Sequence, residues 1–263
     1  MDLKLKGKVA LVTAASRGLG YATALSLAQE GAQIAICSRN QTDIDDAGAE
    51  IADKTGVEVL SRVADITNGE QIEALVNATV AKFGHIDALF INAGGPPPGG
   101  FLDLQPEDWE SAMELTVQSA VRLAYAVVPV MRDHGGGSIL ANTSVSVRYP
   151  LDNLILSNSL RLAVIGLVKS LALELGPDQI RVNAIAPGWT RTDRVDQLLE
   201  NRAETKHTTP DEEARAIAGD LPLRRMAEPE EFARVASFLL SPAASYVTGI
   251  TMLVDGGMAR AIP

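Results

Sequence analysis

Thr13-Ala-Ala-Ser-Arg-Gly18-Leu-Gly20 joins a short apolar run at residues 8–13 to an amphipathic segment at residues 18–30. The run has the length of a buried strand, and the segment has the spacing of a helix. A turn of small residues at this junction lets backbone N–H groups and the helix N-terminus approach a pyrophosphate. A glycine cluster alone is weak evidence, but the flanking strand and helix make a dinucleotide-binding turn the favoured interpretation.

The same alternation of apolar runs and amphipathic segments continues along the chain, which is typical of a parallel sheet covered on both faces. We predict strands at 8–13, 33–37, 57–63, 88–91, 137–143, 181–185 and 251–254. Helices are predicted at 18–30, 42–55, 68–83, 106–133, 154–175 and 229–240. The expected fold is α/β: a single doubly wound (Rossmann) domain over 1–263, with a seven-stranded parallel sheet and helices on both faces.

Composition narrows the functional classes. The chain has 263 residues, of which 46% are hydrophobic, and its 23 basic and 33 acidic residues give a net charge of -10. This balance argues against a nucleic-acid partner, which needs clustered Lys and Arg.

Cys37 is the single cysteine, so no internal disulfide forms and a reducing compartment is favoured. No signal segment opens the chain and no apolar run approaches the roughly 20 residues of a membrane span. We expect a cytoplasmic protein without a membrane partner.

The segment from Trp189 to Glu228 is longer than a connection of 2 to 6 residues, which an ordinary βα loop needs. Thr209-Pro-Asp-Glu212 has the pattern of a capping box with Pro at the first helical position, so the segment is predicted to carry its own short helix. It follows the sixth strand at the carboxyl edge of the sheet, where ligands bind. We therefore interpret residues 190–228 as a lid-like insertion, the alternative being a surface excursion without a role.

Five short motifs now occur in a fixed order. They are the turn at 13–20, Asp65-Ile66, Asn92-Ala-Gly94, Pro187-Gly188 with Thr192, and Val254-Asp-Gly-Gly257. In this order and spacing the chain resembles the short-chain dehydrogenase/reductase family, especially its 3-oxoacyl-[acyl-carrier protein] reductase branch. Ala14 stands where the family has its first glycine; at positive φ an alanine there costs on the order of 1 kcal/mol.

The resemblance implies a nicotinamide dinucleotide cofactor. Residues implied to bind it are Thr13, Ala15, Ser16, Arg17, Gly18, Leu19, Gly20, Ser38, Arg39, Asp65, Ile66, Asn92, Ala93, Gly94, Arg161, Pro187, Gly188, Thr190 and Thr192.

The end of the second predicted strand bears on which cofactor binds. Cys37-Ser-Arg-Asn40 lacks the carboxylate that hydrogen-bonds a free ribose 2'-hydroxyl. Taken alone, either Arg39 or Arg17 would be interpreted as a solvated surface residue. Together they can form a fork around a 2'-phosphate, which favours NADP(H) over NAD(H).

The family's catalytic positions are a serine, a tyrosine, a lysine and an asparagine, and the resemblance places Ser144, Ser157, Arg161 and Thr116 on them. The register of the pair comes from Ile165-Gly-Leu-Val-Lys-Ser-Leu-Ala172, which allows no gap. Three of the four positions have therefore changed, and only the serine is retained.

Carbonyl reduction builds negative charge on oxygen, and a phenol of pKa near 10 is a suitable proton donor. Ser157 is a poor general acid, although its hydroxyl can donate a hydrogen bond or relay through water. Arg161 keeps the positive charge but, with a pKa above 12, cannot shuttle protons. Loss of general acid catalysis costs about 10² to 10⁴ in rate.

Tyr149 is the nearest candidate for a substitute acid, if its phenol reaches the cleft. The alternative is a tyrosine packed against its loop or a neighbouring subunit.

Gly94-Gly-Pro-Pro-Pro-Gly-Gly100 borders the predicted cleft, and either a substrate wall or a rigid turn fits it. His85, His134 and His207 have no carboxylate or cysteine at ligand spacing, so we predict no metal site.

The predicted helices at 106–133 and 154–175 are apolar on more than one face, which is typical of a subunit interface. In the family these helices form a four-helix bundle in dimers that pair into tetramers, so a homo-oligomer is expected.

Two functional hypotheses follow. The first is an NADP(H)-dependent oxidoreductase that interconverts a small carbonyl compound and its alcohol at a Ser/Ser/Arg site. The alternative is a non-catalytic dinucleotide-binding or assembly subunit. A third, non-redox chemistry like that of the related halohydrin dehalogenases, is weakened because they keep the tyrosine and abandon the cofactor site.

Overall fold

A computed structural model describes residues 1–260 of the chain. Seven parallel strands form one sheet in the order β3-β2-β1-β4-β5-β6-β7. Their bounds are β1 Val9–Val12, β2 Gln33–Ser38, β3 Val59–Val63, β4 Ala88–Ile91, β5 Gly137–Asn142, β6 Ile180–Pro187 and β7 Thr251–Val254. All seven predicted strands are therefore confirmed, with ends that shift by at most a few residues.

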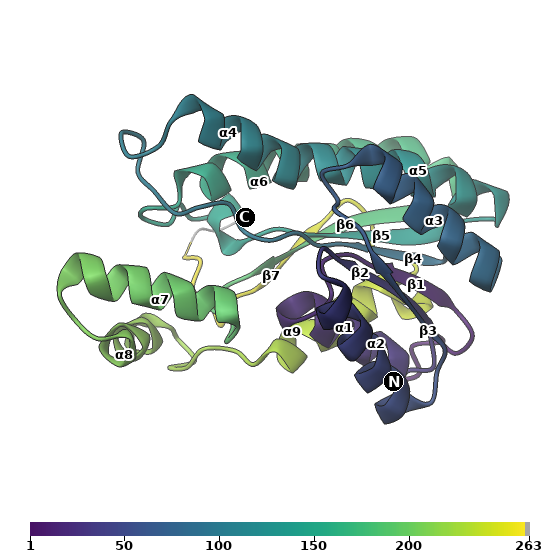
Figure 1. The fold of residues 1–263 in the computed structure, drawn as a ribbon, viewed down its shortest axis with the longest axis horizontal. Helices are drawn as coiled ribbons and strands as arrows, with labels where there is room; N and C mark the ends of the chain where they lie inside the picture. The colour runs from purple at the N-terminus through teal and green to yellow at the C-terminus, as the bar shows by residue number, and fades with distance from the viewer. Residues whose placement is uncertain (261–263) are drawn as a thin grey trace.

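Helices cover both faces of this sheet (Figure 1). On one face lie α1 (Gly18–Gln29), α2 (Gln41–Thr55) and α9 (Pro229–Leu240), and on the other lie α3 (Gly69–Phe83), α5 (Ser119–Asp133) and α6 (Ile155–Leu175). Each face has its own apolar cluster: Leu11 and Leu89 point to the second group of helices, whereas Val12 and Phe90 point to the first. Because neighbouring residues of a strand face opposite sides, strands buried on both faces are apolar throughout.

The helix predicted over 106–133 has an interruption. α4 (Pro106–Met113) leads into a π-helical turn, η1 (Glu114–Gln118), before α5 begins. Such single turns inside helices are frequent at functional sites. The hydrophobic periodicity continues through the turn, so the sequence pattern gives no sign of it.

The insertion contains two helices rather than the one predicted. α8 (Pro210–Asp220) has the expected capping box, in which the Thr209 hydroxyl accepts from Glu212 N and the Glu212 side chain accepts from Thr209 N. α7 (Asp193–Lys206) precedes it and was not predicted. Its N-cap is Thr192, whose hydroxyl accepts from Val195 N. Both helices project beyond one end of the sheet (Figure 1).

Helix α6 corrects the expectation about apolar runs. By length and composition alone this segment qualifies as a membrane span. Its buried side chains, however, pack in the same apolar cluster as the central strands. Leu162 and Leu173 are exposed on its other side. The apolar composition of α6 is therefore that of a core helix whose outer face is also apolar.

The statement that no carboxylate lies at ligand spacing from a histidine is wrong. Asp87 is two residues from His85, its carboxylate is 2.9 Å from His85 Nε2, and His134 stacks on His85. Ligand atoms of the three residues lie within 4.8 Å of one another. The carboxylate also accepts from Lys8 Nζ at 2.9 Å and from Val9 N at 2.8 Å. This ion-pair and hydrogen-bond network already occupies the Asp87 oxygens, so we do not propose a metal there.

Candidate active site

A cavity of about 670 Å³ opens at the carboxyl ends of the strands. It lies where the strand order reverses, because β1 is flanked by β2 on one side and β4 on the other. The connection after β1 and the connection after β4 run to opposite faces of the sheet, so a crevice forms between them. The end of each strand from β4 to β6 adds a polar segment to its wall.

The turn at 13–20 forms one end of the cavity. Thr13 Oγ1 donates to Asn92 O at 2.7 Å, and Asn92 Nδ2 donates to Ala14 O at 3.1 Å. Ala14 has φ of 48°, so it adopts the left-handed conformation that costs an L-residue energy. A Cβ on Gly20 would overlap the Ala14 carbonyl oxygen, so only glycine fits there. Thr13, Ala15 and Gly20 shape this turn without lining the cavity.

Most of the predicted cofactor residues do line the cavity. They are Ser16, Arg17, Gly18, Leu19, Ser38, Arg39, Asp65, Ile66, Asn92, Ala93, Gly94, Arg161, Pro187, Gly188, Thr190 and Thr192.

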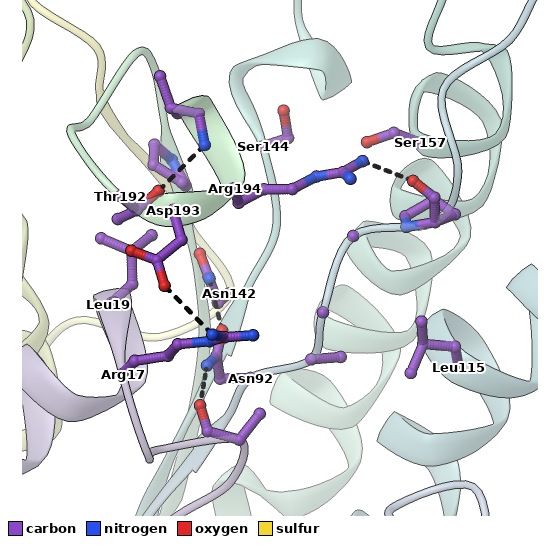
Figure 2. A pocket seen from close by; sticks show the side chains of 18 of the residues that line it. Arg17, Leu19, Asn92, Leu115, Asn142, Ser144, Ser157, Thr192, Asp193 and Arg194 are labelled. Carbon is purple, nitrogen blue, oxygen red and sulfur yellow. Dashed lines mark hydrogen bonds and ion pairs between the residues drawn. The ribbon is translucent and has the colours of Figure 1, made fainter. Parts of the chain in front are cut away.

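Asp65 and Arg39 lie at the end of the cavity reached from β2 and β3. Burial by itself would raise the pKa of Asp65, but hydrogen bonds from Thr67 and the charge of Arg39 bring it below its ordinary value. Asp65 therefore stays ionised at neutral pH, and Arg39 is exposed. Arg17 lines the same cavity and forms an ion pair, with its Nη1 3.3 Å from Asp193 Oδ2 (Figure 2).

Arg161 lies on α6 and is only 8% exposed. Its Nε donates to Ser157 Oγ at 3.2 Å, one helical turn away, and its Nη1 donates to Asn142 O at 3.1 Å. Burial and then the nearby charge of Arg194 lower the pKa of Arg161 to about 10. This pKa is below the ordinary value for arginine, yet Arg161 remains a cation at neutral pH. The structure therefore joins Ser157 and Arg161, which the register placed one helical turn apart, by a hydrogen bond.

Ser144 follows β5 and lines the same cavity. Its Oγ accepts from Ser146 N at 3.1 Å, which caps the short helix η2 (Val145–Val147). As a hydroxyl oxygen that accepts one bond, it keeps a proton to donate into the cavity.

The other two predicted catalytic side chains lie elsewhere. Thr116 is buried in the π-helical turn, does not line the cavity, and its Oγ1 has no hydrogen-bond partner among residues 1–260. Its neighbour Leu115 lines the cavity instead. Tyr149 is 50% exposed and also lies outside the lining. Its backbone N–H donates to Val145 O, which completes the turn after η2 and leaves the phenol at the surface. No tyrosine phenol lines the cavity in the described part of the chain.

The 94–100 loop combines the two roles left open by its sequence. Gly95 and Pro96 line the cavity and so form a wall. Gly99 is fixed, because its N–H donates to Asn153 O at 2.8 Å and its carbonyl accepts from Ile155 N. The loop is therefore a wall anchored to the start of α6.

The sequence reasoning missed several polar residues of this site, among them Asn142, Asp193 and Arg194. Asn142 ends β5, and Asp193 and Arg194 begin α7; all three line the cavity. Burial lowers the pKa of Arg194, which is consistent with a guanidinium inside the cleft. Thr192 as an N-cap was the available signal, since it places the next two residues in the first turn of a helix at the cleft.

The insertion forms a small unit of its own above this site. Trp189, Val195, Leu199, Ile217, Leu221 and Met226 make an apolar cluster separate from the two clusters of the sheet. A β-bridge between Thr190 and Ala227 joins its two ends. α7 faces the cavity through Val195 and Leu198.

Comparisons with known proteins agree with this geometry. A family model described as enoyl-(acyl carrier protein) reductase matches residues 13–259. Dehydrogenase/reductase SDR family member 4 from Sus scrofa is 38% identical over 256 residues, which span 97% of this chain and 88% of that protein. L-sorbose reductase from Gluconobacter frateurii, solved in complex with NADPH and L-sorbose, has a TM-score of 0.94 and 35% identity, with 100% of both chains covered. A 7α-hydroxysteroid dehydrogenase, solved with NADH and 7-oxo glycochenodeoxycholic acid, has a TM-score of 0.89 and 34% identity and covers 100% of this chain and 98% of its own. The chain belongs to the short-chain dehydrogenase/reductase family of oxidoreductases.

Proposed function

We propose that this protein is an NADP(H)-dependent oxidoreductase that interconverts a small carbonyl compound and its alcohol at a Ser144, Ser157 and Arg161 site. The observation that carries the proposal is that one cavity is lined both by residues of the 13–20 turn with Arg39 and by Ser144, Ser157 and Arg161. A redox cofactor and its substrate need such a continuous cleft, because hydride passes between atoms in contact.

The cavity suits a nicotinamide dinucleotide. First-turn N–H groups of α1 lack helical acceptors and favour a phosphate. Thr190 and Asn142 also line the cavity, and Thr190 Oγ1 and Asn142 Oδ1 are buried without a hydrogen-bond partner among the described residues. Buried polar atoms of this kind are costly unless a ligand satisfies them. The related L-sorbose reductase structure holds NADPH and the related 7α-hydroxysteroid dehydrogenase holds NADH.

The preference for NADP(H) rests on charge at the end of β2. Arg39 is exposed there, and Ser38 and Asn40 beside it carry no charge. A guanidinium binds a 2'-phosphate well. Arg17 would join it by leaving Asp193, and that exposed pair is worth little, since its side chains are 72% and 64% exposed.

When bound, the reduced nicotinamide supplies hydride to the carbonyl carbon. Ser157 Oγ already accepts from Arg161, so its own proton is directed elsewhere and can bond the carbonyl oxygen. Ser144 offers a second hydroxyl, and the buried Arg161 cation stabilises the developing oxyanion. Proton delivery then proceeds from water through Ser157, which makes the reaction slower than with a phenol.

Substitution of Ser157 tests this role. We expect Ser157→Ala to lower kcat for NADPH-dependent reduction about tenfold or more, because one oxyanion donor is lost. Ser159→Ala is the matched control, since Ser159 is exposed on the same helix and does not line the cavity. Turnover would be followed by NADPH absorbance across a panel of aldehydes and ketones. Equal rates for the two variants would contradict the assignment of Ser157.

A non-catalytic dinucleotide-binding subunit is the second candidate, and the absence of a phenol among the described cavity residues favours it. It predicts that NADPH binds but is not consumed with any carbonyl of the panel. Introducing Ser157→Tyr and Arg161→Lys together would then measure what the missing pair limits. A gain in reductase activity would show that proton delivery alone had been lost.

A homo-oligomer in the cytoplasm completes the proposal. Tyr125 on α5 is 80% exposed, and Leu162 and Leu173 on α6 are 52% and 75% exposed. Apolar side chains of this size on two adjacent helices suit a symmetric interface.

Cys37 is buried and its pKa is raised to about 11, so it is an unreactive thiol, as a reducing compartment allows.

A further inference from the structure

We propose that Arg161 and Arg194 together bind a carboxylate on the substrate, adjacent to its reacting carbon. The inference rests on the proposed function and names the substrate class: a 2-oxo acid or the corresponding 2-hydroxy acid. The inference follows because Arg161 on α6 and Arg194 on α7 line the same cavity.

Arg194 lies in the first turn of α7 and extends across the cavity toward the 94–100 loop (Figure 2). Its Nη2 donates to Pro96 O at 2.6 Å. The guanidinium lies against Gly95, where a Cβ would be 2.8 Å from Arg194 Nε. The loop therefore supplies both an acceptor and the space for this side chain, so the position of the guanidinium is built into the wall.

Neither arginine has an acidic partner. No ion pair of Arg161 or Arg194 with a carboxylate occurs within residues 1–260. Asp193, next to Arg194 in sequence, turns away toward Arg17 (Figure 2). Two half-buried or buried cations that face one hollow repel each other, and the charge of Arg194 contributes to the lowered pKa of Arg161. An oxyanion between them would remove this repulsion and accept charge-assisted hydrogen bonds.

The anion is better assigned to the substrate than to the phosphates of the cofactor. Phosphates are expected at the 13–20 turn, where Arg17 already lies, whereas Arg194 points to the side of the cavity that holds Ser157 (Figure 2). Ser144 and Ser157 are the hydroxyls placed for a carbonyl oxygen. A carboxylate bound by the two arginines would therefore lie next to the carbonyl that these hydroxyls bind. Guanidinium groups suit the planar shape of a carboxylate.

Oxamate, an unreactive mimic of a 2-oxo acid, tests the proposal, and its uncharged ethyl ester is the control ligand. Binding would be measured by calorimetry with cofactor-free and NADPH-saturated protein. We expect oxamate to bind both forms at least about tenfold more tightly than the ester. Arg194→Met should weaken oxamate binding about 10- to 100-fold and leave NADPH affinity unchanged.

Arg191→Met is the matched variant, because Arg191 lies three residues away, is exposed, and does not line the cavity. It should leave oxamate affinity unchanged. Gly95→Ala is a second probe that keeps both arginines but displaces the Arg194 guanidinium, and it should weaken oxamate binding several-fold.

Three results would overturn the assignment. One is oxamate binding no tighter than its ester, or not at all; another is an unchanged oxamate affinity in Arg194→Met. The third is Arg194→Met weakening NADPH while oxamate binds as before, which would assign Arg194 to a cofactor phosphate. Failure of the wild-type protein to bind any nicotinamide cofactor would overturn the proposed function instead, and the cofactor-free titration would still decide whether the arginine pair binds a carboxylate.

Discussion

Arg161 is a buried charge that bears on both the proposed chemistry and the stability of this site. Its guanidinium is 8% exposed, and burial holds its pKa near 10. Because the folded pKa lies below the ordinary arginine value, the folded state binds this proton less tightly than the unfolded state does. At neutral pH the group is charged in both states, so its burial opposes folding by about 3 kcal/mol, at roughly 1.4 kcal/mol per pKa unit. The opposition declines as the pH rises above 10.

We expect Arg161→Met to raise the free energy of unfolding by up to about 3 kcal/mol while it lowers reductase activity, because the proposed function depends on a destabilising charge. Urea unfolding monitored by circular dichroism would measure the gain. Arg191→Met is the control, and since Arg191 and Glu228 form an exposed pair it should change stability by less than about 1 kcal/mol. A destabilised Arg161→Met protein would mean that the bonds to Ser157 and Asn142 outweigh the burial of charge.

Ala14 makes a simpler prediction about stability. Its φ of 48° costs an alanine about 1 to 2 kcal/mol, and glycine avoids this cost but gains freedom in the unfolded chain. Ala14→Gly should therefore raise the free energy of unfolding by about 0.5 to 1 kcal/mol. Ala15→Gly, at a buried neighbour without positive φ, should lower it. Thermal unfolding of both variants would measure these changes. A lower melting temperature in Ala14→Gly than in the wild-type protein would contradict backbone strain at Ala14.

Arg39 carries the prediction on cofactor choice. Arg39→Asp replaces the proposed partner of a 2'-phosphate by a group that repels it and can accept from a free 2'-hydroxyl. We expect NADPH affinity to fall about 10- to 100-fold and NADH affinity to hold or rise. Arg62→Asp changes the charge equally on the exposed part of β3, outside the cavity, and should affect neither affinity. An unchanged ratio in Arg39→Asp would remove Arg39 from cofactor recognition.

At the scale of elements, the insertion that holds α7 and α8 is a separate unit of stability. Its apolar cluster does not merge with those of the sheet, so it can open without unfolding the rest. The capping box of Thr209 and Glu212 holds α8, and loss of such a cap costs about 1 kcal/mol. Thr209→Ala should therefore speed amide hydrogen exchange in α8 about fivefold and leave β4 and β5 unchanged.

Thr205→Ala is the control for this experiment, because the Thr205 hydroxyl only bonds back to Asn201 O within α7. Exchange that accelerates equally throughout the sheet in Thr209→Ala would show that the insertion and the sheet open together. Saturation with NADPH should slow exchange in α7, whose first turn lines the cavity.

The elements also show what the sequence could predict. Strands and helices of the sheet were predictable because each face buries a continuous apolar cluster, which fixes periodicity and length. α7 was missed because charged residues dominate it and only Val195, Leu199 and Ala203 are buried. The π-helical turn was missed because it preserves the apolar spacing. Within this turn Leu115 lines the cavity and Thr116 does not. Most of the residues that the motifs predicted for the cofactor line the cavity. Arg194 was not predicted, because its place in the cavity depends on how a long insertion folds back.

For the whole molecule, the exposed apolar face of α5 and α6 predicts self-association. Leu173→Glu places a charge on this face, where Leu173 is 75% exposed, and should dissociate the oligomer. Leu223→Glu is the matched control, since Leu223 is 63% exposed but lies beyond α8 in the insertion. Light scattering coupled to size exclusion would report the mass. A monomeric wild-type protein, or an oligomer unaffected by Leu173→Glu, would contradict an interface on this face.

The central claim is that the whole molecule remains a nicotinamide-dependent oxidoreductase although its tyrosine and lysine are absent. Titration of the wild-type protein with NADPH and with NADH tests this most directly, and Trp189, which lines the cavity, provides the fluorescence signal. We predict saturable quenching by both cofactors, with NADPH bound at least about tenfold more tightly because Arg39 contributes a charged hydrogen bond. Binding of neither cofactor would contradict the account.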